Sequence, residues 1–235
     1  MTPARDDEPT ARYGESSKKP KPLIEFAGAL VEAPFPVWSG RDFGMWWDVR
    51  GPYTKPRTMP VRSVVLHHTA AENPPARVFR NLCARGLSVQ FVIGHDGDVW
   101  QFADARDTVC WHAGHANAFS VGVEIVSKGC GTPDPNHARE MYLDQLNGKM
   151  RQFLRFSQLQ VLAAHDLSKL LCELHSIPFV VVGEPGHEAH RYTMSGHDYT
   201  NFRGVLGHYH ISPSKRDPSP HILDEIKRAS ELGRH

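Results

Sequence analysis

Val64-Val65-Leu66-His67-His68-Thr69 is an apolar run that ends in two histidines and a threonine. Consecutive apolar residues in such a short run indicate a strand that is buried on both faces. Because side chains alternate along a strand, the two histidines point to opposite faces, and only one of them can enter a given cleft. The stretch therefore predicts an interior strand that delivers one imidazole to a site at its end.

Short strands and helices are expected to follow this run along the chain. Ser157 and Gln160 form the pattern of a capping box at the start of the most regular helix, and the leucines after it, from Leu159 and Leu162 onward, are expected to face the core. Asp96-Gly97 between two apolar runs predicts a hairpin. Expected strands cover 64–66, 89–93, 98–102, 120–126 and 179–182, and expected helices cover 76–84, 157–175 and a segment from Pro220 onward. This mixture predicts an α/β sandwich with a mixed central β-sheet flanked by helices.

The chain has 235 residues, of which 40% are hydrophobic, which is enough for one large domain. Residues 1–22 offer almost nothing to bury and are expected to form a flexible tail. Residues 23–60 are aromatic but broken by proline and glycine, so we expect an irregular extension packed on the domain. Residues 61–235 are expected to form the main domain.

Charge and composition exclude several classes of partner. The formal net charge is +1, from 27 Lys and Arg against 26 Asp and Glu, so we expect no nucleic-acid binding. No apolar stretch approaches the ~20 residues that span a bilayer, and no signal pattern is present, so we expect no stable membrane insertion and a cytoplasmic protein as synthesised. The four cysteines form no CxxC pair, which argues against a thiolate metal site and leaves one disulfide possible.

A second segment, Gly207–Pro218, carries the ligand types that complete a metal site. His208 and Asp217 lie nine residues apart across a turn marked by Pro213, so the chain can double back and bring both to one ion. Imidazoles and a carboxylate suit a tetrahedral zinc that keeps one position for water. An open position of this kind distinguishes a catalytic zinc from a structural one.

Five motifs occur in a fixed order along the chain: V-V-L-H-H-T-A, D-G-D-V-W-Q, W-H-A-G, N-x-x-S-V-G-V-E and G-H-x-x-I-S-P-x-K-x-D-P. In this order the set resembles the zinc-dependent N-acetylmuramoyl-L-alanine amidases of type 2. That family includes phage endolysins and is related in fold to peptidoglycan-recognition proteins. The resemblance runs from Val61 to Leu223, roughly two-thirds of the chain, and no single motif would establish it alone.

The resemblance implies a role for particular side chains. It implies that His67, His208 and Asp217 bind Zn²⁺. Glu124 matches the glutamate that handles the nucleophilic water, and Lys215 matches the lysine that steadies the developing oxyanion. The implied reaction is hydrolysis of the amide bond between N-acetylmuramic acid and L-alanine.

The resemblance also implies that His112 and Asn117 line the groove for a peptidoglycan or muropeptide substrate. We expect the protein to act as a monomer. The alternative is a non-catalytic module of the same fold that binds peptidoglycan without cleaving it. Within the enzyme hypothesis, residues 61–235 form the catalytic domain, and intact wall and soluble wall fragments remain alternative substrates. A role at the cell wall would require release or export, because we expect a cytoplasmic protein as synthesised.

Overall fold

A seven-stranded mixed sheet organises the computed structural model, which describes residues 18–130, 140–183 and 189–232. In the order in which they lie, the strands are β1 (Lys21–Phe26), β2 (Ala29–Ser39), β6 (Val99–Gln101), β5 (Phe91–Ile93), β8 (Ser120–Ile125), β4 (Ser63–His68) and β11 (Gly204–Gly207). β5, β8, β4 and β11 run parallel to one another, and β5 and β6 form the predicted antiparallel hairpin.

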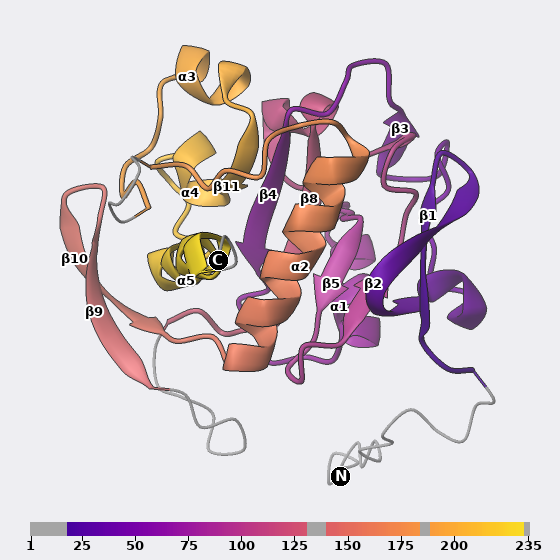
Figure 1. The fold of residues 1–235 in the computed structure, drawn as a ribbon, viewed down its shortest axis with the longest axis horizontal. Helices are drawn as coiled ribbons and strands as arrows, with labels where there is room; N and C mark the ends of the chain where they lie inside the picture. Colours follow the sequence, from indigo (N-terminus) through magenta and orange to yellow (C-terminus); the bar gives the residue numbers. More distant parts are fainter. Residues whose placement is uncertain (1–17, 131–139, 184–188, 233–235) are drawn as a thin grey trace, which may run out of the picture.

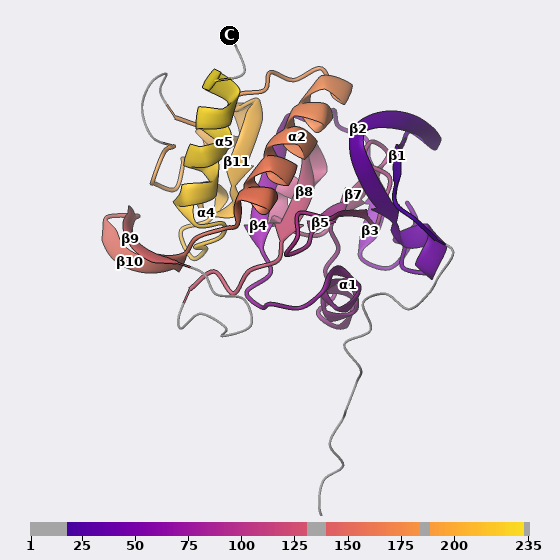
Figure 2. The ribbon, with the colours of Figure 1, turned by 60° about the horizontal axis from the view of Figure 1, so that its bottom comes forward.

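Helices cover both faces of this sheet. α2 (Gln158–Leu174) and α5 (Pro220–Leu232) lie together on one face, and α1 (Pro75–Ala84) lies on the other (Figures 1 and 2). The shorter helices are η1 (Gly40–Phe43), η2 (Gly114–Phe119), α3 (Gly196–Asn201) and α4 (His208–Ile211). The predicted α/β sandwich with a mixed sheet flanked by helices is confirmed.

The core explains why the central strands are almost entirely apolar. On the α2 and α5 side, Val64 and Leu66 of β4 pack with Ile222 and Ile226 of α5 in one large cluster of buried residues. On the α1 side, Val78 packs in a second cluster beneath that helix. Parallel strands covered on both faces must be apolar on both, which is why 64–66 was identifiable as a strand.

Helix α2 begins as predicted but turns a different side to the core. Ser157 accepts from the Gln160 backbone amide, which completes the capping box. Leu159 and Leu162 are nevertheless 56% and 44% exposed, so the prediction that they face the core was wrong. The reason is Gln160, whose buried amide donates to the carbonyls of Gly94 and Val126 and thereby fixes the rotation of the first turn.

The N-terminal extension is more regular than expected. Instead of an irregular cover over 23–60, β1 and β2 extend the sheet, and β2 pairs in parallel with β6. Pro34 and Pro36 lie where the β1–β2 register is broken by a bulge, so their missing N–H groups remove no ladder bond there. Of the expected tail, 1–17 lie outside the described residues, whereas Lys21 already belongs to β1. The exact boundary of the catalytic domain stays a prediction.

Three further segments complete the fold. β3 (Thr54–Pro56) pairs with β7 (Thr108–Cys110), and β9 (Met141–Leu146) with β10 (Lys149–Leu154) forms a hairpin at the side of the domain (Figure 1). The strand expected at 179–182 is reduced to a single bridge between Val181 and Val205. All four cysteines are free thiols, and no helix of the described residues is long and apolar enough to cross a membrane.

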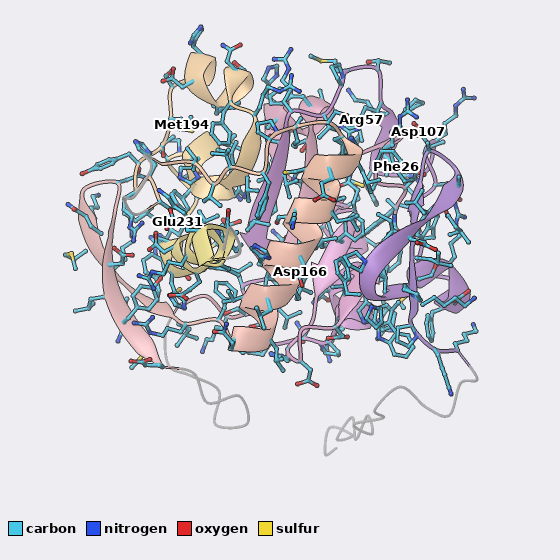
Figure 3. All side chains as sticks on the ribbon, in the orientation of Figure 1. Phe26, Arg57, Asp107, Asp166, Met194 and Glu231 are labelled. Carbon is cyan, nitrogen blue, oxygen red and sulfur yellow. The ribbon has the colours of Figure 1, made fainter. Side chains whose placement is uncertain are left out.

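Arg57 ties the extension to the segment that precedes β8. Its guanidinium is buried near β3, in the region where Figure 3 also labels Phe26 and Asp107. Burial lowers the pKa of Arg57 to about 10. The group donates to backbone carbonyls of residues 106, 108, 117, 118 and 120. One side chain therefore fixes the backbone on both sides of η2.

Candidate active site

His67, His208 and Asp217 meet at one end of the sheet. Their facing atoms form a triangle in which each side is 3.0 Å: His67 Nδ1 to His208 Nδ1, His67 Nδ1 to Asp217 Oδ2, and His208 Nδ1 to Asp217 Oδ2. His67 and His208 are 2% and 7% exposed. Within the described part of the chain, these residues form the one group of His, Cys, Asp or Glu side chains arranged to hold a metal ion.

The topology explains this convergence. β4 and β11 are parallel neighbours, and Gly207 pairs with Leu66. The next residue of each strand is therefore a histidine at the same edge, although the two are 141 positions apart in sequence. Asp217 is brought back by a backbone hydrogen bond from the Tyr209 amide to its carbonyl, at 3.0 Å. The predicted doubling back of this segment thus occurs.

The donor set fits a metal cation in type, spacing and ionisation. An ideal tetrahedral zinc with bonds of about 2.0–2.1 Å spaces its ligand atoms roughly 3.3 Å apart, close to the observed triangle. Burial and the neighbouring His208 lower the pKa of His67 to about 4. Although burial opposes ionisation, the close contacts of this carboxylate with His208 and His67 hold the pKa of Asp217 well below its usual range. Neutral imidazoles and an ionised carboxylate are the forms that bind metal.

Glu124 lies beside this triangle because β8 pairs with β4. In that parallel register Glu124 is the direct partner of His67, so both side chains share one face of the sheet. Its Oε2 atom is buried and has no hydrogen-bond partner. Burial, reinforced by the Asp217 charge, raises the pKa of Glu124 to about 8. A carboxyl group with a free oxygen and a raised pKa can both accept and release a proton near neutrality.

A cavity of ≈ 390 Å³ opens over these residues. Its walls include Glu124, Lys215 and His112, together with Asn81 of α1 and Arg85, the residue that caps the C-terminal end of that helix. Asn81 and Arg85 were missed by sequence reasoning. Polar residues at i and i+4 at the end of a short helix could have indicated them, because this spacing puts both on nearly the same side.

The remaining sequence-predicted residues have distinct places. Asn117 does not line the cavity; its Oδ1 accepts from the backbone amides of His112 at 3.0 Å and Ala113 at 2.5 Å. His112 lines the cavity and its Nδ1 lies 2.9 Å from His67 Nε2. His68 packs its ring against Gly129, and its Nδ1 is buried without a partner. Of the two adjacent histidines, His67 belongs to the triangle, and its role as a metal ligand stays a prediction.

Comparison with known proteins agrees with this geometry. The family model described as N-acetylmuramoyl-L-alanine amidase matches residues 57–220. The endolysin amidase LysCS from Clostridium intestinale URNW is 14% identical, with a TM-score of 0.50 over 85% of this chain and 97% of that chain. A structure of the peptidoglycan recognition proteins LCa and LCx, bound to tracheal cytotoxin, is 19% identical, with a TM-score of 0.48 over 82% of this chain and 95% of that chain. The E. coli amidase AmiD, in complex with anhydro-N-acetylmuramic acid-L-Ala-D-gamma-Glu-L-Lys, is 17% identical, with a TM-score of 0.44 over 85% of this chain and 62% of that chain. No curated protein sequence matches the chain.

The family match spans most of the chain and contains the whole triangle together with Glu124 and Lys215. The likeness to LysCS, at its low identity, independently supports the fold. This chain is therefore an enzyme that belongs to the N-acetylmuramoyl-L-alanine amidase family.

Proposed function

We propose that the chain hydrolyses the amide bond between N-acetylmuramic acid and L-alanine in peptidoglycan or muropeptides, with one zinc ion held by His67, His208 and Asp217. The observation that carries the proposal is the buried triangle of donor atoms with sides of 3.0 Å. When bound, zinc supplies Lewis acidity that polarises the substrate carbonyl and makes water nucleophilic near neutral pH.

Glu124 is proposed as the general base and then the general acid. It takes a proton from the attacking water as the oxygen–carbon bond forms, and gives a proton to the departing amine as the carbon–nitrogen bond breaks. Its unpaired Oε2 and raised pKa support this role. Lys215, which lines the same cavity, is proposed to stabilise the negative charge that develops on the carbonyl oxygen.

We propose that the 112–117 turn borders the substrate groove. His112 supports this by lining the cavity, and Asn117 supports it by fixing the turn through the amides of His112 and Ala113. We also propose that the protein acts as a monomer without stable membrane insertion. All donors of the triangle come from one chain, so the site needs no residue from a second copy.

The test is mass spectrometry of muropeptide digests. Zinc-loaded protein is expected to release free stem peptides that begin with L-alanine, and a chelator is expected to stop the release until zinc is restored. Glu124→Gln should release stem peptides about 10²–10⁴-fold more slowly, whereas Glu173→Gln, which changes an exposed glutamate on α2, should match the wild type. Uncut muropeptides that still bind in the presence of chelator would instead identify a non-catalytic binding module.

The same assay separates the two substrate pools. Intact sacculi and soluble anhydro-muropeptides are offered at equal stem-peptide concentration. Faster release from sacculi indicates a wall-degrading enzyme that must reach the wall after release or export. Faster release from soluble fragments indicates an enzyme that processes wall fragments.

A further inference from the structure

Behind His67, on the side away from the triangle, a chain of polar groups runs to a backbone carbonyl. His67 Nε2 lies 2.9 Å from His112 Nδ1. The other ring nitrogen of His112, Nε2, lies 3.3 Å from Ser120 Oγ. The Ser120 hydroxyl in turn donates to the Ala116 carbonyl at 2.7 Å. None of these contacts has a part in the proposed reaction steps.

The direction of this chain follows from its last member. A backbone carbonyl can only accept, so the single hydroxyl proton of Ser120 is committed to Ala116. Ser120 Oγ must then accept from His112 Nε2–H, which leaves His112 Nδ1 with a lone pair. That lone pair accepts from His67 Nε2–H. His67 is thereby held in the tautomer whose Nδ1 lone pair faces the triangle.

Gly122 provides the space in which the His112 ring lies. A Cβ atom built on Gly122 would come within 2.7 Å of His112 Cγ and 2.8 Å of its Nδ1. Contacts this short do not occur between carbon atoms, so any side chain at this position would displace the ring. The absence of a side chain in a central strand commonly marks such a close approach.

We propose that His112 is a positioning residue of the metal site, which accepts from His67 Nε2–H and so aims His67 Nδ1 at the triangle. The inference rests on the proposed function, because it takes His67 to be a metal ligand. It gives His112 a role beyond bordering the groove. Partners that hold the second nitrogen of a ligating histidine typically contribute 10- to 100-fold to metal affinity.

Two substitutions at His112 separate acceptance of the hydrogen bond from packing. In His112→Asn, Oδ1 occupies the position of the ring Nδ1 and can still accept from His67, so zinc affinity should fall by less than about tenfold. His112→Leu fills similar space without an acceptor, and its affinity should fall by about 10- to 100-fold. Gly122→Ala should also lower the zinc affinity, because the added methyl group would displace the His112 ring. His115→Leu is the matched control, because His115 lies exposed in the same turn, where its ring meets the Phe119 ring edge-on, and it is not part of the hydrogen-bond chain.

Zinc dissociation constants are measured by competition with a chromogenic chelator, and melting curves of the zinc-free variants confirm that each is folded. Histidine ¹⁵N–¹H spectra of the zinc-loaded wild type should show His67 protonated at Nε2. Equal affinities of wild type and His112→Leu would overturn the inference, as would an Asn variant as weak as the Leu variant. A wild type that binds no zinc, or whose affinity survives His67→Ala, would overturn the proposed function itself.

Discussion

Replacing Glu124 by Gln should strongly slow hydrolysis and at the same time change the pH dependence of stability in the zinc-free protein. Its carboxyl group is buried, Oε2 has no partner, and its pKa is raised from an ordinary 4.5 to about 8. Between these two values the folded state holds a proton that the unfolded state has lost. The free energy of unfolding of the wild type therefore falls as pH rises from 4.5 to 8. Glutamine, which does not ionise, removes this contribution.

The magnitude follows from 1.36 kcal/mol for each unit of pKa difference. From pH 5 to pH 7 the Gln variant should gain roughly 2 kcal/mol relative to the wild type, after discounting for the partial access of solvent through the cavity. An unpaired amide at this position costs about 1–3 kcal/mol. That cost lowers the free energy of unfolding of the variant by the same amount at every pH. The informative quantity is therefore the slope, against pH, of the difference in free energy of unfolding between the variant and the wild type.

Urea unfolding in the presence of a chelator, repeated at half-unit steps of pH, measures this slope. Zinc favours the ionised carboxylate, so the same titration with zinc present should show a smaller slope. A constant difference between the two proteins from pH 5 to pH 8 would refute the reasoning, because it would mean that Glu124 ionises normally in the folded protein. In activity assays the variant should lose about 10²–10⁴ in kcat.

Three other outcomes are expected. Lys215→Met should lower kcat by about 10²–10³ with little change in KM, measured by muropeptide turnover, since it removes one stabilising group from the developing oxyanion. Zinc at a hundred times its Kd should add about 2.7 kcal/mol to the free energy of unfolding, and this gain should be absent in His67→Ala, as melting curves with and without chelator would show. Arg57→Met should lower the free energy of unfolding by about 2–4 kcal/mol, because it leaves buried carbonyls without their donor; an unchanged urea midpoint would contradict this.

Local sequence patterns predicted the structure correctly where a short segment determines its own conformation. The capping box at Ser157 and the hairpin around Asp96-Gly97 were predicted correctly, because each depends on residues within a few positions of one another. The exposed Leu159 shows the limit of such signals. Its side of α2 was decided by Gln160, whose partners Gly94 and Val126 lie far away in sequence.

The N-terminal strands were missed for a related reason. Pro34 and Pro36 argue against a strand by propensity alone, yet both are tolerated in β2 at a break in its pairing with β1. No nearby residue in the sequence indicates that the pairing is broken there. The parallel pairing of β2 with β6, some sixty residues further along the chain, makes the segment part of the sheet.

The triangle of donor atoms depends on topology in the same way. His208 and Asp217 could be expected to approach each other, because a short turn joins them. Their approach to His67 requires that β11 lie beside β4, and no residue of either strand specifies that neighbour. Only the family resemblance indicates from the sequence that these three residues form one site, because it assigns all three positions together.

The sequence of β8 indicates a functional face as well as a buried strand. Ser120, Gly122 and Glu124 alternate with apolar residues, so all three face the same side. A glutamate on a central strand and a glycine two residues before it each lack a packing explanation, and both are explained by the site: Gly122 leaves room for the His112 ring, and Glu124 pairs with His67. Because one rigid, buried strand holds the end of the hydrogen-bond chain, the space for the ring and the proposed base, these groups cannot shift independently. The arrangement around His67 is thus preorganised by the backbone of a single strand.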